Sequence, residues 1–171
     1  ATVTSTPILD SGYVYAGSND GTLLQLEAES GDEQNASQLD AAIYGQPSVG
    51  RHVYALTADG TLSAREQDDL DEDWRLETAG EEIRSSQIAQ YTSVYIVTDA
   101  VYEVNVFDGA VNSEMDYGGA AGATPLYNGR LYAGDAGGSF YAFDESTGDT
   151  HWTYDADSAV TSATVDDSGR I

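Results

Sequence analysis

The sequence of 171 residues contains neither cysteine nor lysine. Without cysteine the chain forms no disulfide and offers no thiolate to a metal ion or a substrate. No run of apolar residues is long enough to cross a bilayer, and no secretion signal is recognisable. Because the sequence opens Ala-Thr-Val rather than with methionine, these absences support no conclusion about a leader, an anchor or further domains.

The charge of the chain is strongly one-sided. Six basic residues, all arginine, stand against 30 acidic residues, and the formal net charge is −24. These charges repel one another in dilute buffer, whereas in molar salt the Debye length falls to about 3 Å and the repulsion is screened. The composition therefore predicts a protein adapted to concentrated salt, with a merely acidic, solvated surface as the alternative. The same charge disfavours nucleic acids and anionic membranes as partners.

A repeat of about 39 residues runs through the sequence. Its markers are the tyrosines Tyr15, Tyr54, Tyr95 and Tyr132, the turn positions Asp20, Asp59, Asp99 and Gly137, and the tryptophans Trp74 and Trp152. The repeats cover approximately residues 3–42, 43–82, 83–120 and 121–159, and residues 160–171 begin a fifth that is incomplete. We interpret residues 1–171 as a single domain built from these units.

Each repeat is predicted to form short antiparallel strands. In the first repeat an alternating stretch ends at Asn19-Asp20-Gly21, a strong hairpin turn, and the following apolar stretch ends at Ser30-Gly31. No segment shows a sustained helical period. Four such strands in about 40 residues describe one blade of a β-propeller, which buries its faces by stacking on neighbouring blades. The predicted fold class is therefore all-β, a propeller of four-stranded antiparallel blades.

The segment from Ala142 to Trp152 reads AFDESTGDTHW and fits the pattern A-x-D-x-x-x-G-x-x-x-W. This pattern resembles the tryptophan-docking motif of the pyrroloquinoline-quinone-type β-propeller repeat family, including its haloarchaeal members. The motif positions in the last repeat are Ala142, Asp144, Gly148 and Trp152. The second repeat has Ala64, Glu66, Leu70 and Trp74, and the first has Gln25, Glu27, Gly31 and Asn35. The third is aligned as Val104 and Val106, without a tryptophan and with Gly109 one residue early.

The resemblance implies a structural role for these residues. In that family the tryptophan packs between blades, beside the alanine and glycine of a neighbouring repeat. A flat indole fills the gap between twisted sheets, and small residues let it approach. The predicted inter-blade residues are Ala142, Asp144, Gly148, Trp152, Ala64, Glu66, Trp74, Glu27 and Gly31.

Few residues suggest chemistry. His52 and His151 stand alone in the sequence and are predicted to lie on the surface, with no His, Asp or Glu at a zinc-ligand spacing. The acidic run Asp68 to Asp73 offers oxygens to calcium but lacks the order of an EF-hand, so a solvated turn is favoured. Quinone-dependent dehydrogenases of the family hold pyrroloquinoline quinone and calcium in a central funnel, and nothing here marks such a site. We therefore predict no catalytic, cofactor-binding or metal-binding residue.

The predicted function is a non-enzymatic scaffold for protein–protein interaction or surface assembly, outside the cell or on its surface, in a halophile. The family includes such scaffolds, among them a propeller lipoprotein of outer-membrane assembly and many secreted archaeal proteins. The alternatives are a propeller fragment of a quinone-dependent dehydrogenase and the sensor domain of a signalling protein. The expected partners are other protein chains or further blades of the same polypeptide, with neither nucleic acid nor direct insertion into a membrane.

The two ends of the sequence resemble each other. Val160 to Val165 corresponds to Val3 to Ile8, and Asp167-Ser168-Gly169 to Asp10-Ser11-Gly12. In a closed ring both ends would compete for one place in the same blade. The sequence therefore predicts about four blades in an open arc, a part of a larger propeller.

Overall fold

The computed structural model describes residues 2–78, 88–98, 100–116 and 126–160, and all regular structure in these ranges is β-strand. Four antiparallel sheets follow one another along the chain, each with its four strands hydrogen-bonded in sequence order. The first two blades consist of β1 (Ile8–Asp10), β2 (Tyr13–Gly17), β3 (Thr22–Glu27) and β4 (Glu33–Gln38), then β5 (Ile43–Val49), β6 (Val53–Thr57), β7 (Thr61–Arg65) and β8 (Glu72–Glu77). The other two consist of β9 (Ile88–Gln90), β10 (Ser93–Val97), β11 (Ala100–Asn105) and β12 (Val111–Asp116), then β13 (Leu126–Tyr127), β14 (Arg130–Gly134), β15 (Ser139–Asp144) and β16 (Thr150–Asp155).

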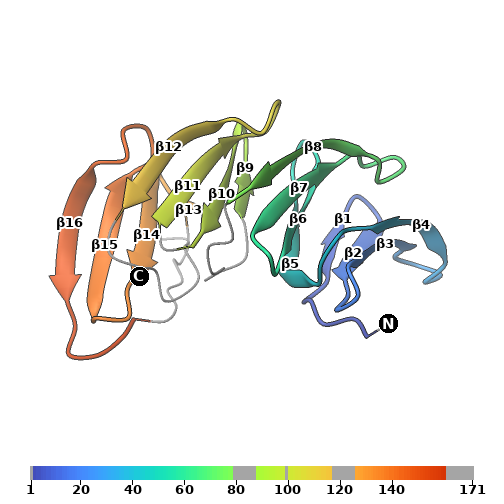
Figure 1. The fold of residues 1–171 in the computed structure, drawn as a ribbon, viewed down its shortest axis with the longest axis horizontal. Helices are drawn as coiled ribbons and strands as arrows, with labels where there is room; N and C mark the ends of the chain where they lie inside the picture. Colours follow the sequence, from blue (N-terminus) through green and yellow to red (C-terminus); the bar gives the residue numbers. More distant parts are fainter. Residues whose placement is uncertain (1, 79–87, 99, 117–125, 161–171) are drawn as a thin grey trace.

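The blades stand side by side in an arc that does not close (Figure 1). The first blade lies at one end and the fourth at the other, with the second and third between them. The predicted fold class, four-stranded antiparallel blades in an open arc, is confirmed. The incomplete fifth repeat lies outside the described residues, except for Val160.

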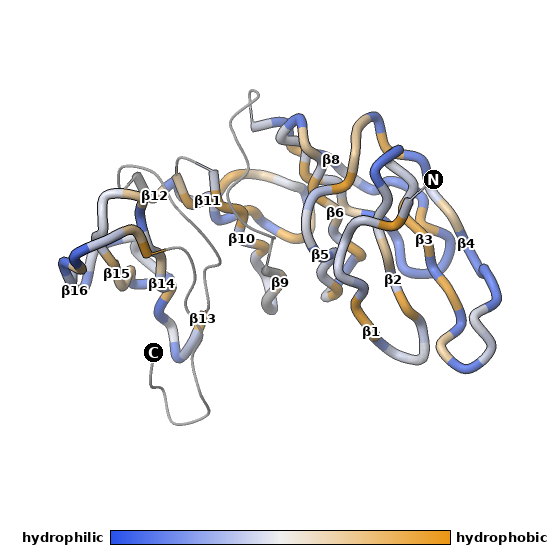
Figure 2. The backbone as a smooth tube through the Cα atoms, turned by 90° about the horizontal axis from the view of Figure 1, so that it is seen from below, coloured by the Kyte–Doolittle hydropathy of each residue, from blue (hydrophilic) through white to orange (hydrophobic). Residues whose placement is uncertain are grey.

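The hydrophobic core consists of layers between successive blades. One cluster joins blades one and two (Tyr15, Leu23, Leu39, Ile43, Val53, Ala55 and Leu70), a second joins blades two and three, and a third joins blades three and four. Strands β6 and β10 are buried along their whole length, whereas every residue of β16 is exposed. In Figure 2 hydrophobic colour accordingly collects within the arc and hydrophilic colour on the outer strands β4 and β16. Blade stacking, rather than any single sheet, therefore removes the apolar surface from water.

Carboxylates hold the hairpin turns between the second and third strands of the blades. Asp20 accepts hydrogen bonds from the hydroxyls of Ser18 and Thr22, and these bonds lower its pKa to about 2. Asp59 accepts a bond from the Thr57 hydroxyl (2.6 Å), which lowers its pKa as well. In the fourth blade the acceptor is Asp135, which binds the Ser139 amide at 2.7 Å. Asp99, the expected turn acid of the third blade, lies outside the described residues.

A left-handed residue ends the turn between the third and fourth strands of every blade. Gly31, Leu70, Gly109 and Gly148 have φ of 76°, 61°, 70° and 73°. Each donates its amide N–H to the carbonyl four residues earlier, on Glu27, Glu66, Asn105 and Asp144 respectively. Leu70 thus takes a conformation that normally favours glycine. The turn is therefore equivalent in all four blades.

This equivalence corrects the alignment of the third repeat. Asn105, not Val106, stands at the motif aspartate position, and Gly109 is in register rather than one residue early. Tyr95 pairs with Glu103, eight residues later, whereas Tyr54 pairs with Ala64, ten residues later. The shorter hairpin after β10 shifted the predicted register. Glu103 therefore replaces the motif alanine, which the alignment had assigned to Val104.

Tyr91, in the turn between β9 and β10, provides a test of backbone strain. Its φ is 48°, a left-handed value, and its side chain is 88% exposed, so packing offers little compensation. The equivalent turn in blade four uses Asn128, with φ 51°. Because asparagine tolerates this conformation, Tyr91→Asn should stabilise the fold by about 1 kcal/mol in denaturant unfolding. The control Tyr44→Asn, in strand β5, should give no gain; equal effects of the two changes would contradict the strain argument.

Candidate functional site

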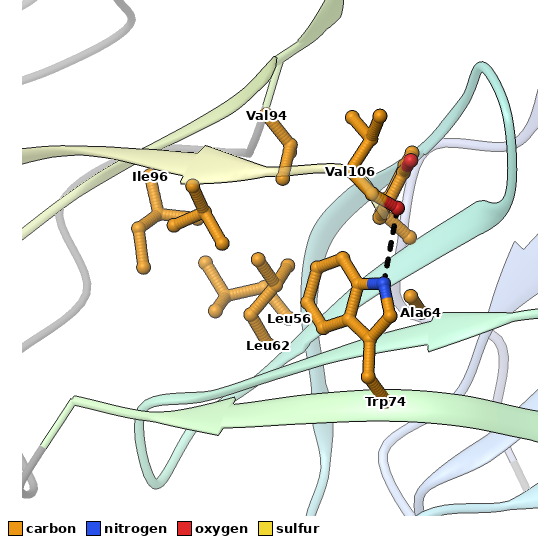
Figure 3. Packing of buried hydrophobic residues seen from close by; sticks show 9 residues of the cluster. Leu56, Leu62, Ala64, Trp74, Val94, Ile96 and Val106 are labelled. Atoms are coloured by element: carbon orange, nitrogen blue, oxygen red, sulfur yellow. Dashed lines mark hydrogen bonds between the residues drawn. The ribbon is translucent and has the colours of Figure 1, made fainter. Parts of the chain in front are cut away.

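The junction between blades two and three shows how a blade docks on the next one. Trp74 lies on β8 opposite Ala64, is 9% exposed, and donates its indole N–H to the Val106 carbonyl at 3.0 Å (Figure 3). A Cβ built on Gly109 would lie 2.6 Å from the indole. Gly109 is thus required both for its positive φ and for the space above it. Trp74 thus lies between blades two and three.

Leucine and valine side chains complete the same junction. Figure 3 shows Leu56 and Leu62 of blade two facing Val94 and Ile96 of blade three, beside the indole of Trp74. All four aliphatic side chains are fully buried. A fully buried side chain of this size contributes about 1.5–3 kcal/mol. The junction is therefore a hydrophobic interface with one directed hydrogen bond.

The junction between blades one and two uses two amides in place of the tryptophan. Gln25 donates to the carbonyl of Gln67 and Asn35 to that of Asp68, both at 2.9 Å. Gln25 and Asn35 pair across β3 and β4, as Ala64 and Trp74 do in blade two. Both departures from the motif are visible in the sequence, but their joint role is visible only in the structure. The signal was that both positions had changed to amides in the same repeat.

The junction between blades three and four has no indole. Ser113 stands at the tryptophan position and donates its hydroxyl to Glu103 at 3.1 Å. A polar cavity of about 440 Å³ lies beside Glu103, lined also by the turn residues Asp144 and Glu145 of blade four. The side chain that contacts the turn glycine of blade four is Met115, because a Cβ built on Gly148 would lie 3.2 Å from the Met115 Cγ.

One hydrogen bond crosses this junction as well. The Tyr95 hydroxyl donates to Glu145 at 3.0 Å. Burial, together with the charges of Glu103 and Glu145, raises the pKa of Tyr95, so the phenol stays protonated and acts as a donor.

The fourth blade carries a docking tryptophan whose ring is partly open to solvent. Trp152 pairs with Ala142 across β15 and β16, as Trp74 pairs with Ala64, but it is 36% exposed. Its ring contacts Phe140 and Tyr132, with centroids 5.7 and 6.0 Å away. The exposed Tyr154 lies two residues further along the same strand. We call Trp152, Tyr154 and Phe140 the aromatic end face.

The first blade has a left-handed turn at Gly31 that no side chain of the described residues covers, which complements the partly exposed Trp152. A Cβ built on Gly31 would meet no atom within 4 Å, although the turn has the same conformation as that of Gly109. Its motif acid, Glu27, accepts a hydrogen bond from the Ser30 hydroxyl at 2.6 Å. In the last blade Asp144 holds the turn in the same way, and bonds from Ser146 lower its pKa. Glu27 and Asp144 thus stabilise turns.

The structure places His52 differently from the sequence prediction. His52 is buried, 1% exposed, whereas His151 is exposed as expected. The Nε2 atom of His52 lies 3.0 Å from Asp73 and 3.6 Å from Glu66. The residues are far apart in sequence, and the antiparallel pairing of β6, β7 and β8 brings them together. The prediction of a surface histidine was wrong because it counted sequence spacing and not cross-strand neighbours.

Within the described ranges, no helix combines the length and apolar character that a membrane span requires.

Comparison with solved structures shows a β-propeller fold. The crystal structure of BamB from Moraxella catarrhalis superimposes with a TM-score of 0.75 at 18% sequence identity, over 90% of this chain. The chain spans about half of that structure, 53% of its length. No curated protein sequence gave a significant match.

A family model matches the chain along its whole length. The model describes the outer membrane protein assembly factor BamB and matches residues 1–111 and 97–171. The two matches overlap, as expected for repeats that align in more than one register. Together with the four blades and the docking contacts between them, this match shows that the chain belongs to the BamB family of β-propellers with pyrroloquinoline-quinone-type repeats.

Proposed function

We propose that the chain is a non-enzymatic interaction scaffold whose two end blades are docking surfaces. The observation that carries this proposal is the pair of unused docking features, Trp152 at one end of the arc and Gly31 at the other. A similar assembly role is part of the name of the family to which the chain belongs. The scaffold is proposed to act in a salt-rich setting, outside the cell or on its surface.

The second junction indicates what covers Trp152. There the indole of Trp74 meets the turn that ends at the left-handed Gly109. The carbonyl that accepts the indole N–H belongs to Val106, three residues before this glycine. The turn of blade one has the same layout, with Ala28 three residues before Gly31. The occupant we infer for the aromatic end face is therefore a blade of this repeat type, presented by the same polypeptide or by a second chain.

The position of Val160, the last described residue, favours a further blade after blade four. Val160 donates its amide to the Asp135 carbonyl at 3.1 Å, as Ile43 donates to the Ser18 carbonyl at 3.0 Å. Ile43 begins β5, the first strand of the blade after blade one. A Cβ on Gly134 would collide with Val160 just as one on Gly17 would collide with Ile43. Val160 thus has the position from which a following blade starts.

Loss of the docking indole should abolish self-association. In molar salt, where the net charge is screened, we expect the chain to associate head to tail, and Trp152→Ala to leave it monomeric in sedimentation velocity. Trp74→Ala, at the buried junction, should instead cost about 3–5 kcal/mol of folding stability. Because Trp152 is partly exposed, its replacement should cost clearly less. A chain that stays monomeric at every concentration, or associates regardless of Trp152, would contradict the proposal.

The receiving turn can be blocked independently. Asparagine tolerates a left-handed φ, so Gly31→Asn should fold while its side chain fills the place of an incoming indole. We expect this variant to lose association as Trp152→Ala does. The matched control is Gly129→Asn, because Gly129 has a φ of 74° and open space around its Cβ position. Equal association of the two glycine variants would exclude Gly31 from the docking surface.

Salt should control folding stability. The net charge of −24 is repulsive when unscreened, so the melting temperature should rise steeply from about 0.1 M to about 3 M sodium chloride. The measurement is thermal unfolding followed by circular dichroism. A melting temperature that is flat over this range would contradict the salt-adapted interpretation.

A further inference from the structure

We propose that His52, Glu66 and Asp73 bind one divalent transition-metal ion, with Zn²⁺ as the ion that fits best. The three side chains lie at or next to the ends of three consecutive strands of blade two. His52 precedes β6, Glu66 follows β7, and Asp73 lies on β8. One potential ligand atom from each residue lies within 4.8 Å of the others.

The distances suit a tetrahedral ion. Zinc binds imidazole nitrogen and carboxylate oxygen at about 2.0–2.2 Å, which places two such ligands about 3.3 Å apart around a tetrahedral centre. In the structure the Nε2 atom of His52 lies 3.0 Å from Oδ2 of Asp73 and 3.6 Å from Oε1 of Glu66. Both distances lie close to this value. The two carboxylate oxygens lie within 4.8 Å of each other and would move inward to hold the ion.

The burial of His52 is the second and independent observation. Its imidazole is 1% exposed and points from the protein interior towards the two carboxylates, whose side chains are 56% and 42% exposed. The edge contacts with the rings of Tyr54 and Trp74 fix its orientation. The hydroxyl of Tyr54 lies 3.5 Å from Nδ1, the nitrogen that faces away from the cluster. Such an oriented imidazole is typical of metal sites.

The carboxylates are available as ligands. Within the described ranges, the only polar contacts of the Glu66 and Asp73 side chains are those with His52. Both carboxylates face solvent, so an ion has a path of entry and keeps one position for water. The imidazole favours zinc and its neighbours over calcium, which takes 6–8 oxygen ligands. The acidic run Asp68 to Asp73, which the sequence predicts to be a solvated turn, contributes Asp73 alone.

The site is specific to the second blade. At the positions of His52 and Glu66 the other blades pair Tyr13 with Glu27, Ser93 with Asn105, and Arg130 with Asp144. The imidazole is also in ring contact with Trp74, the residue that docks on blade three. An ion held only by the folded cluster stabilises the fold by linkage. Zinc would thus strengthen the blade that carries the buried docking tryptophan.

Zinc binding to the full chain tests the proposal. After dialysis against a chelator, the protein is titrated with zinc in about 1 M potassium nitrate, which screens diffuse attraction to the acidic surface. We expect one site per chain, and Glu66→Gln and Asp73→Asn should each weaken binding at least about tenfold. The matched control is Asp71→Asn, which removes the same charge from the same acidic run and should leave the affinity unchanged.

A spectroscopic readout identifies the ligand directly. The chain has two histidines, so a nitrogen-15 imidazole spectrum contains two sets of signals, and a His151→Asn variant assigns them. Stoichiometric zinc should shift the Nε2 signal of His52 and leave His151 unchanged. If zinc leaves the His52 signal in place, or binds the Glu66 and Asp71 variants equally, the proposal is wrong. His52 and the two carboxylates are then a polar cluster that holds no metal ion. Loss of zinc binding leaves the docking role of Trp152 untouched, so the two proposals fail separately.

Discussion

The structure depends on one recurring contact, in which a side chain from the last two strands of a blade reaches the left-handed turn of the next. At the second junction Trp74 donates its indole N–H to the Val106 carbonyl and packs on Gly109. At the first junction Asn35 bonds a carbonyl in the turn that ends at Leu70. At the third junction Met115 packs against Gly148. The left-handed turn is the same at all three junctions, whereas the side chain that meets it changes from indole to amide to thioether. At the third junction that side chain is Met115, two residues beyond Ser113, which stands at the tryptophan position.

The separation of apolar residues in the interior from acidic residues on the surface follows from this contact. The layers between blades are apolar and closely packed, so acidic residues are left for the outer strands and turns. Several of these acids stabilise the fold, because Asp20, Asp59 and Asp144 accept hydrogen bonds that hold tight turns. Others form ion pairs, since Glu72 binds Arg65 and Arg75. The net charge of −24 that remains over the whole chain is repulsive and is screened by concentrated salt. In the His52 cluster, two carboxylates of this acidic surface lie beside a buried imidazole.

Much of the fold was predictable from the sequence, because strands, turns and the docking motif are local patterns. The spacing of Tyr54, Asp59 and Trp74 identified a blade, and the pattern around Trp152 identified the repeat family. The third repeat was misaligned since the hairpin after Tyr95 is two residues shorter, and only the strand pairing reveals that Glu103 takes the alanine position. The burial of His52 was also missed. Its neighbours Glu66 and Asp73 approach through cross-strand pairing, which sequence spacing does not record.

The two indoles provide the most direct test of the docking account. A nitrogen-15 spectrum of the protein in molar salt contains two indole N–H signals, because the chain has two tryptophans. The account predicts that the Trp74 signal is protected from hydrogen exchange at every protein concentration, through its bond to the Val106 carbonyl. The Trp152 signal should exchange quickly in dilute protein and become protected as the concentration rises. Rapid exchange at Trp74, or a Trp152 signal that stays unprotected at every concentration, would contradict the claim that this contact joins blades and that the end blades use it to bind partners.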